Sequence, residues 1–179
     1  MKKIFLLAGV AMLLSWSMSA EEITGGTVDG ADKVTAEKEA AKLTWFTNLE
    51  KAKEAAGKRK VGIMVYFSGT DWCPACKIFD KYVLSSPDFI NYAKYNLVLL
   101  NIYFPRDSSK VSQATKEYNT KLGKTFGVVA FPSIFLLKSN GESATAEIGY
   151  RGESGARYVA KIKAILAKAE QSVKSEEIK

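Results

Sequence analysis

Hydrophobic and polar positions alternate along the chain in blocks that predict strands and helices in turn. Three nearly continuous apolar runs, rich in β-branched and aromatic residues, predict buried strands over 61–67, 97–103 and 131–137. Helical spacing of apolar residues, or helix start and stop signals, predicts helices over 49–56, 77–84, 89–95, 109–126 and from 155 onward. Weaker runs predict short edge strands over 43–46 and 144–148, the second after an Asn-Gly turn. This order predicts an α/β fold with a mixed sheet and helices on both faces.

Polar residues next to these runs predict where the helices begin and end. Thr47 and Glu50 match a capping box, and Gly57 is the expected left-handed end of that helix. Residues 58–60 are then a solvated turn. Ser86, followed by proline, is the expected cap of a later helix.

The first twenty residues have the pattern of a secretory signal peptide. A basic start precedes an apolar run, and small residues lead to Ala20, where we expect cleavage. The run is shorter than the roughly 20 residues of a membrane span, so we expect a periplasmic or otherwise secreted protein without a stable span; an uncleaved anchor is the alternative. Beyond it we expect a flexible leader that could include a short helix over 21–42, one domain over 43–172 and a charged tail over 173–179.

Composition excludes several classes of function. The formal net charge is +7, but acids and bases are mixed along the chain without a basic stripe that carries aromatic residues, so we expect no nucleic-acid partner. The chain has two cysteines and no histidine, which cannot complete a four-ligand zinc site. Haem attachment would need a histidine at position 77, where the chain has Lys77. We therefore expect neither a metal nor a cofactor.

Both cysteines, Cys73 and Cys76, lie at the junction between the first long strand and the following helix. The N-terminal end of a helix favours a thiolate over a thiol. We expect Cys73 to be the more exposed, attacking thiol and Cys76 the buried one that resolves the mixed disulfide. Pro74 fits the first helical turn and stiffens the loop. A purely structural disulfide is the alternative, although so short a loop constrains the unfolded chain little.

This order of elements, with the sequence Trp72-Cys73-Pro74-Ala75-Cys76 after the first long strand and Pro132 opening the third, resembles thioredoxin. The resemblance covers roughly residues 45–166. Secreted bacterial thioredoxin-like proteins and the C-terminal domain of membrane thiol:disulfide interchange proteins are similar in pattern. It implies a thioredoxin fold, with a central mixed sheet of four to five strands flanked by helices. It also implies that Cys73 and Cys76 are the catalytic residues.

The resemblance assigns roles to three further residues. Pro132 matches the cis-proline that lies against the disulfide and shapes the substrate groove, and Ser133 takes the place of the usual threonine. Phe131 is bulkier than is common there and would narrow or re-tune the groove. Trp72 is either part of a substrate-facing surface or an aromatic lid over the core.

Some positions depart from the thioredoxin pattern. Tyr66 and Leu99 stand where many relatives have a buried aspartate and a lysine, so the sequence does not identify the proton acceptor for Cys76. We expect Tyr66 to serve in core packing, since a phenol has a pKa of about 10. Asp71 either caps a helix or turn or raises the pKa of Cys73, and Lys77 either stabilises a thiolate or is simply solvated.

These observations predict a secreted thiol–disulfide oxidoreductase that acts on protein cysteines. The missing histidine of strong oxidases favours reductase or isomerase-type service. The expected partners are cysteine-containing proteins, or one dedicated client such as apocytochrome thiols, together with a membrane or periplasmic protein that recharges the pair. The alternative is a thioredoxin-fold binding module whose disulfide is structural and does not turn over.

Overall fold

A four-stranded mixed sheet forms the centre of the part of the chain that the computed structural model describes, residues 43–176. The strands are β1 (Trp45–Phe46), β2 (Gly62–Ser68), β3 (Leu97–Tyr103) and β4 (Ser133–Leu137). They lie in the order β1-β3-β2-β4, with β4 antiparallel to β2 and the other pairs parallel. The three long strands predicted from the sequence are confirmed. The predicted signal peptide and leader lie outside the described residues.

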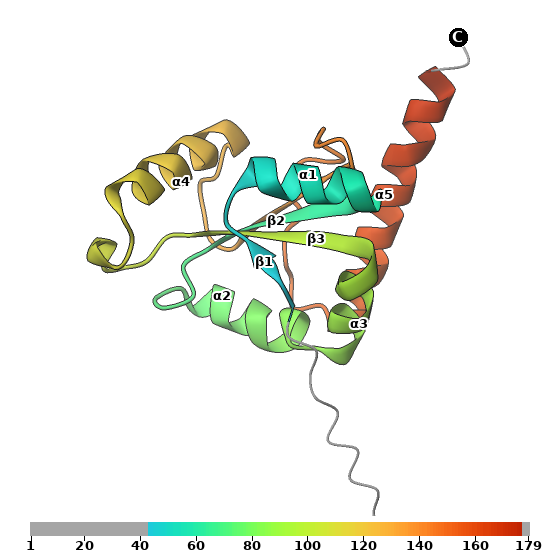
Figure 1. The fold of residues 1–179 in the computed structure, drawn as a ribbon. Helices are drawn as coiled ribbons and strands as arrows, with labels where there is room; N and C mark the ends of the chain where they lie inside the picture. The colour runs from blue at the N-terminus through green and yellow to red at the C-terminus, as the bar shows by residue number, and fades with distance from the viewer. Residues whose placement is uncertain (1–42, 177–179) are drawn as a thin grey trace, which may run out of the picture. The chain divides into compact units, whose positions relative to one another are not determined.

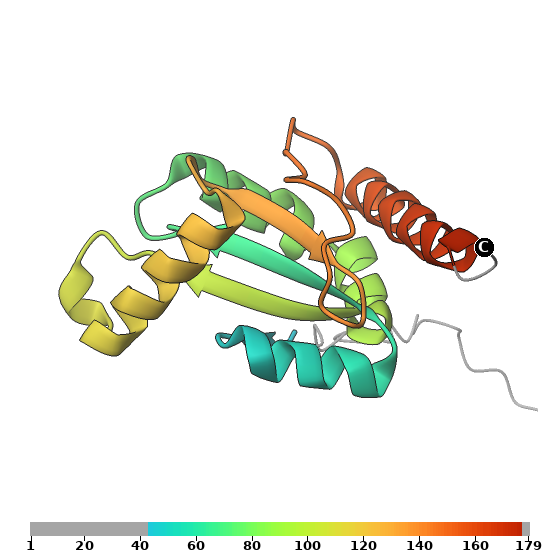
Figure 2. The same cartoon turned by 90° about the horizontal axis from the view of Figure 1, so that it is seen from above.

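Helices cover both faces of this sheet (Figures 1 and 2). The helices are α1 (Leu49–Arg59), α2 (Pro74–Phe79), α3 (Pro87–Asn96), α4 (Gln113–Phe126) and α5 (Gly155–Glu176). Helices α1 and α4 pack on one face, and α2, α3 and α5 on the other. Among the residues described, none of the helices has the length and apolar character needed to cross a membrane.

Strand β2 is buried between these two helix layers, which explains its continuous apolar sequence. Alternate side chains of a strand point to opposite faces. Ile63 and Phe67 pack toward α1 and α4, whereas Met64 and Tyr66 pack toward α2, α3 and α5. The face that carries Tyr66 is therefore the one on which the cysteine helix lies.

The predicted capping box of the first helix is wrong. Asn48, not Thr47, is the N-cap: its backbone is extended and its side-chain oxygen accepts a hydrogen bond of 3.0 Å from the Lys51 N–H. The helix also passes through Gly57 and ends at Arg59, with Lys60 in the left-handed conformation at φ 53°. Two adjacent residues could each cap this helix, and the cap chemistry alone does not separate them.

Arg59 explains why the helix continues past the predicted stop. Its guanidinium donates hydrogen bonds of 2.9 and 3.0 Å to the carbonyl oxygens of Lys94 and Leu97, at the end of α3. Carbonyls at a helix end lack partners within the helix, so this contact satisfies them. Residues 58–60 are therefore not the simple solvated turn that the sequence predicts.

The cysteine helix and its successor begin and end close to the predicted places. Helix α2 starts at Pro74, and a π-helical turn, Asp80–Leu84, continues it to the predicted end. Ser86 caps α3 as predicted, accepting a hydrogen bond of 3.2 Å from the Phe89 N–H.

Two later helices differ from the prediction at their ends. In place of one helix from 109, a short 3₁₀ turn (Ser108–Lys110) precedes α4, which ends at Gly127 as expected. Helix α5 extends to Glu176, past the boundary that the sequence predicts at 172.

The predicted fifth strand over 144–148 is not formed, so β4 is the edge of the sheet. The N–H groups of Ala144 and Ile148 donate to the carbonyl oxygens of Leu136 and Ile134. These bonds span two residues of β4 but four of the returning segment, so the segment cannot keep the regular ladder of a strand. The hairpin turn itself is present, with Gly141 at φ 86°.

Removing the cap of α1 should destabilise the protein. We expect Asn48→Ala to lower the free energy of unfolding by about 1 kcal/mol, because the Lys51 N–H loses its acceptor. Thr47→Ala is the matched control and should leave stability nearly unchanged. Urea unfolding of both variants measures the difference; equal losses would contradict the assignment of the cap.

Candidate active site

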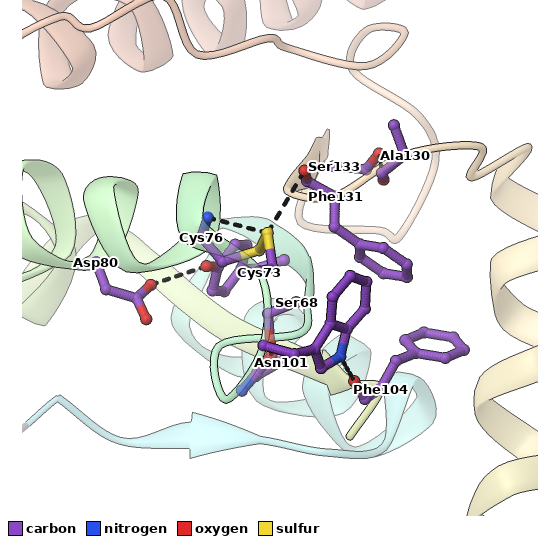
Figure 3. The surroundings of a disulfide bond; sticks show 11 residues. Ser68, Cys73, Cys76, Asp80, Asn101, Phe104, Ala130, Phe131 and Ser133 are labelled. Atoms are coloured by element: carbon purple, nitrogen blue, oxygen red, sulfur yellow. Dashed lines mark hydrogen bonds between the residues drawn. A yellow bond between two sulfur atoms is a disulfide. The ribbon is translucent and has the colours of Figure 1, made fainter. Parts of the chain in front are cut away.

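Cys73 and Cys76 form a disulfide at the N-terminal end of α2 (Figure 3). Cys73 is the N-cap of this helix, and its Sγ accepts a hydrogen bond of 3.1 Å from the Cys76 N–H. Pro74 occupies the first helical turn, where a missing N–H costs nothing. In the reduced state the same N–H and the positive end of the helix would stabilise a thiolate at Cys73.

The loop before Cys73 closes tightly on the end of β2. The N–H groups of Trp72 and Cys73 donate to the Gly69 carbonyl oxygen at 2.9 and 2.7 Å. Ser68, the last residue of β2, donates from its hydroxyl to the Asn101 side chain on β3 at 2.8 Å. These bonds hold the disulfide at the C-terminal ends of the two central parallel strands.

Cys73 is more enclosed than the sequence indicates. Cys76 is fully buried, as expected, whereas Cys73 exposes 4% of its surface. Cys73 is the more exposed of the two, but only by this margin. Little of the Cys73 side chain is therefore open to solvent in the disulfide form.

The loop before β4 lies against the disulfide. The Phe131–Pro132 peptide bond is cis, as the resemblance to thioredoxin implies. The Phe131 carbonyl oxygen is 3.6 Å from Cys73 Sγ (Figure 3). Ser133 donates from its hydroxyl to the Ala130 carbonyl oxygen at 2.7 Å, which fastens the turn around the proline.

Three aromatic side chains, Trp72, Phe104 and Phe131, form a cluster beside the disulfide, here called the aromatic wall. Trp72 Nε1 donates a hydrogen bond of 2.7 Å to the Phe104 carbonyl oxygen. The ring of Phe131 lies 5.6 Å from Trp72, edge to face, and 5.2 Å from Phe104. All three are half-buried, so each leaves part of its surface beside the cysteines. Trp72 thus faces this loop cluster and is not enclosed in the core.

Asp71 does not cap α2, since Cys73 is the cap. Its carboxylate accepts a hydrogen bond of 3.0 Å from the Arg106 N–H, which ties the cysteine loop to the loop after β3. Desolvation is the largest single influence and acts against its charge, but hydrogen bonds, led by those from the Arg106 N–H and the Tyr103 hydroxyl, together with the charge of Lys110 outweigh it and lower the pKa of Asp71. Lys77 is exposed on the helix surface.

Tyr66 does more than fill the core. Its hydroxyl donates a hydrogen bond of 2.8 Å to Oδ1 of Asp80, a half-buried carboxyl one helical turn after Cys76. Burial raises the pKa of Asp80, partly offset by hydrogen bonds from Tyr66 and Thr70. Burial and this carboxyl also raise the pKa of Tyr66. Sequence reasoning missed Asp80; its spacing of four residues from Cys76 is the one signal that could have found it.

A redox-capable cysteine pair at a helix N-terminus, beside a cis-proline on a thioredoxin fold, defines a thiol–disulfide oxidoreductase. The family model described as "Thioredoxin-like domain" matches residues 49–165, and the chain belongs to this family. The sequence resemblance to thioredoxin is therefore confirmed.

The chain is also similar to individual proteins within this family. The chain is 28% identical over 127 residues to "Disulfide bond reductase DsbH" of Chlamydia pneumoniae, covering 71% of this chain and 75% of that protein. It is 32% identical over 104 residues to "Thiol:disulfide interchange protein DsbD" of Haemophilus ducreyi, covering 58% of this chain but 16% of that protein. A solved structure titled "DsbH Oxidoreductase" aligns with a TM-score of 0.66 and 25% identity, over 80% of this chain and 95% of that one.

A methyl group added at Gly69 should displace Trp72 from the aromatic wall. A Cβ at this glycine would lie 2.5 Å from the Trp72 indole, so we expect Gly69→Ala to cost about 1–3 kcal/mol of stability and to move the indole N–H signal of Trp72 in NMR spectra. Gly149→Ala is the matched control, because a Cβ there meets nothing within 4 Å. An unmoved indole signal in Gly69→Ala would contradict the assigned packing.

Proposed function

We propose that the protein is an exported reductase-type thiol–disulfide oxidoreductase that passes electrons from its cysteine pair to disulfides of other proteins. The observation that carries the proposal is the hydrogen bond from the Cys76 N–H to Cys73 Sγ beside the cis Phe131–Pro132 bond. Two facts support the reducing direction. One relative is named a disulfide bond reductase, and Pro74-Ala75 between the cysteines lacks the histidine of strong oxidases.

In the first step the Cys73 thiolate attacks one sulfur of a client disulfide. A bond forms between Cys73 Sγ and that sulfur, and the other client sulfur leaves as a thiolate. The Cys76 N–H favours this step, because a hydrogen bond to the thiolate lowers the thiol pKa.

In the second step Cys76 loses its proton and attacks Cys73 Sγ. The intramolecular disulfide forms, and the remaining client sulfur leaves, so the client gains two electrons and the cysteine pair loses two. The cysteines are 5.3 Å apart at Cα, so the attack needs no large movement of the chain. Another protein must then reduce the pair before the next cycle.

The client should bind along the surface made by the aromatic wall and the loop of Pro132. Phe131 presents its carbonyl toward Cys73 and its ring toward Trp72, so one residue borders both the sulfur and the aromatic surface. Pro74 stiffens the start of α2, next to Cys73. With Cys73 so enclosed, we expect extended or unfolded client segments to react faster than disulfides held within folded domains.

We place this activity in the periplasm or in another exported compartment. The support is the signal-peptide pattern of residues 1–20, with cleavage after Ala20. An oxidising compartment would keep the cysteine pair in the disulfide form, so the proposal needs a membrane or periplasmic partner that reduces it again.

Mixed disulfides should accumulate when only the resolving cysteine is removed. We expect the wild type with a dithiol donor to reduce insulin, Cys76→Ser to trap client proteins through Cys73, and Cys73→Ser to trap none. Non-reducing gels after acid quenching measure the trapping. The proposal would be refuted if the wild type did not turn over and Cys76→Ser trapped no client. The protein would then be a binding module with a structural disulfide, and a double Cys→Ala variant that still binds would support that alternative.

A further inference from the structure

We propose that Asp80, held by the Tyr66 hydroxyl, accepts the proton of the Cys76 thiol when the mixed disulfide is resolved. This inference rests on the proposed function and names the proton acceptor for Cys76, which that proposal leaves unassigned. The thioredoxin-like relatives that carry a strand aspartate have a carboxyl where this chain has Tyr66. Here the carboxyl comes from the helix and the strand supplies a hydroxyl that positions it.

Asp80 and Cys76 lie on the same face of the cysteine helix. The helical backbone continues from α2 into Asp80, whose φ and ψ are −57° and −46°. Residues four apart in a helix have Cβ atoms about 5–6 Å apart. Figure 3 shows the Asp80 carboxylate turned to the side of the helix on which the disulfide lies, where it takes part in a hydrogen bond.

Tyr66 fixes the carboxyl in this position. The Tyr66 side chain is 2% exposed on β2, and its ring packs against Phe79 at 5.4 Å and Trp45 at 6.1 Å. Such packing leaves the hydroxyl little freedom, and it donates to Asp80 Oδ1 at 2.8 Å. Tyr66 is therefore a positioning residue, because it acts on the cysteine through Asp80.

The helix changes its hydrogen-bond pattern at this residue. The Ser85 N–H donates to the Asp80 carbonyl oxygen at 2.9 Å, a spacing of five residues that makes the turn π-helical. Single π turns are rare and occur often at functional sites. The turn begins at the residue that we assign to proton transfer.

The groups that face Asp80 leave it without a compensating cation. Tyr66 on β2 and Thr70 in the cysteine loop hydrogen-bond to it, and Tyr158 of α5 interacts with Tyr66. Lys77 and Lys81, on its own helical segment, are exposed, and within the described residues no ion pair joins a cation to Asp80. Burial therefore dominates and raises the pKa of this carboxyl, which makes its anion a stronger base.

The proposed step balances in protons and electrons. The Asp80 carboxylate takes the proton of the Cys76 thiol, and the resulting thiolate attacks Cys73 Sγ. The bond between Cys73 and the client sulfur breaks, and that sulfur leaves as a thiolate. Asp80 then returns its proton to solvent or to the departing thiolate, so that it is ready for the next cycle.

The resolving step can be measured apart from the first attack with the chromogenic disulfide DTNB. The reduced protein releases one thionitrobenzoate when Cys73 attacks and a second when Cys76 resolves the adduct. We expect Asp80→Asn to slow the second release about 10-fold to 100-fold near neutral pH and to leave the first essentially unchanged. The deficit should shrink at pH values above the unperturbed thiol pKa of about 8.5, where Cys76 can lose its proton without Asp80.

Conservative variants separate proton transfer from a structural role. Asp80→Glu should recover the rate in part. Tyr66→Phe removes a hydrogen bond that lowers the pKa of Asp80, so the rise of the second rate with pH should move to higher pH. If Asp80→Asn does not fold, these two variants carry the test. Asp88→Asn and Tyr95→Phe, which change exposed residues in the same way, should match the wild type.

Two outcomes would overturn the inference, and they are distinguishable. A second release in folded Asp80→Asn that follows the wild type at every pH would show that Asp80 takes no proton while the oxidoreductase remains active. A second release that keeps the wild-type rate in Asp80→Glu and the wild-type pH profile in Tyr66→Phe would show the same. A wild type that never gives the second release would refute the proposed function and this inference with it.

Discussion

The hydrogen bond from the Cys76 N–H to Cys73 Sγ is the contact on which the rest of the site depends. It exists because Cys73 caps α2 in an extended conformation while Cys76 is already helical. This cap in turn requires β2 to end at Ser68 and the following loop to close on the Gly69 carbonyl oxygen. The buried central strand, the tight loop and the helix start therefore act together to hold one sulfur at a helix N-terminus.

Two groups of residues surround the disulfide, one next to each cysteine. The Phe131–Pro132 loop and the aromatic wall border Cys73, where a client must arrive. The hydrogen-bonded pair Tyr66 and Asp80 joins β2 to the cysteine helix one turn after Cys76. One side is apolar and half-exposed, and the other is enclosed and can exchange a proton. This separation suits a reaction whose two steps use the two sulfurs in turn.

Much of the fold could be predicted from the sequence because its strongest signals are local. The apolar runs of β2 and β3 and the Asn-Gly turn carry their own patterns. What could not be predicted depends on partners distant in the chain. The end of α1 is held by Arg59, which reaches the carbonyl oxygens of Lys94 and Leu97 where α3 passes into β3. Residues 144–148 do not form a strand, because their hydrogen bonds to β4 do not keep the spacing of a regular ladder.

The same distinction between local signals and distant partners applies to the candidate site. The cysteines and Pro132 follow from spacing and resemblance, whereas the near-complete burial of Cys73 arises from packing of a loop that follows more than fifty residues later. Asp80 was missed because its significance lies in a hydrogen bond to a residue on another element.

The reduction potential of the Cys73–Cys76 pair tests the central claim most directly. Equilibration of the purified protein with glutathione or dithiothreitol buffers of known potential, followed by thiol alkylation, measures it. A reductase should give a value near that of thioredoxin, about −270 mV. A value near about −120 mV, typical of a strong oxidase, would contradict the proposed direction of electron flow.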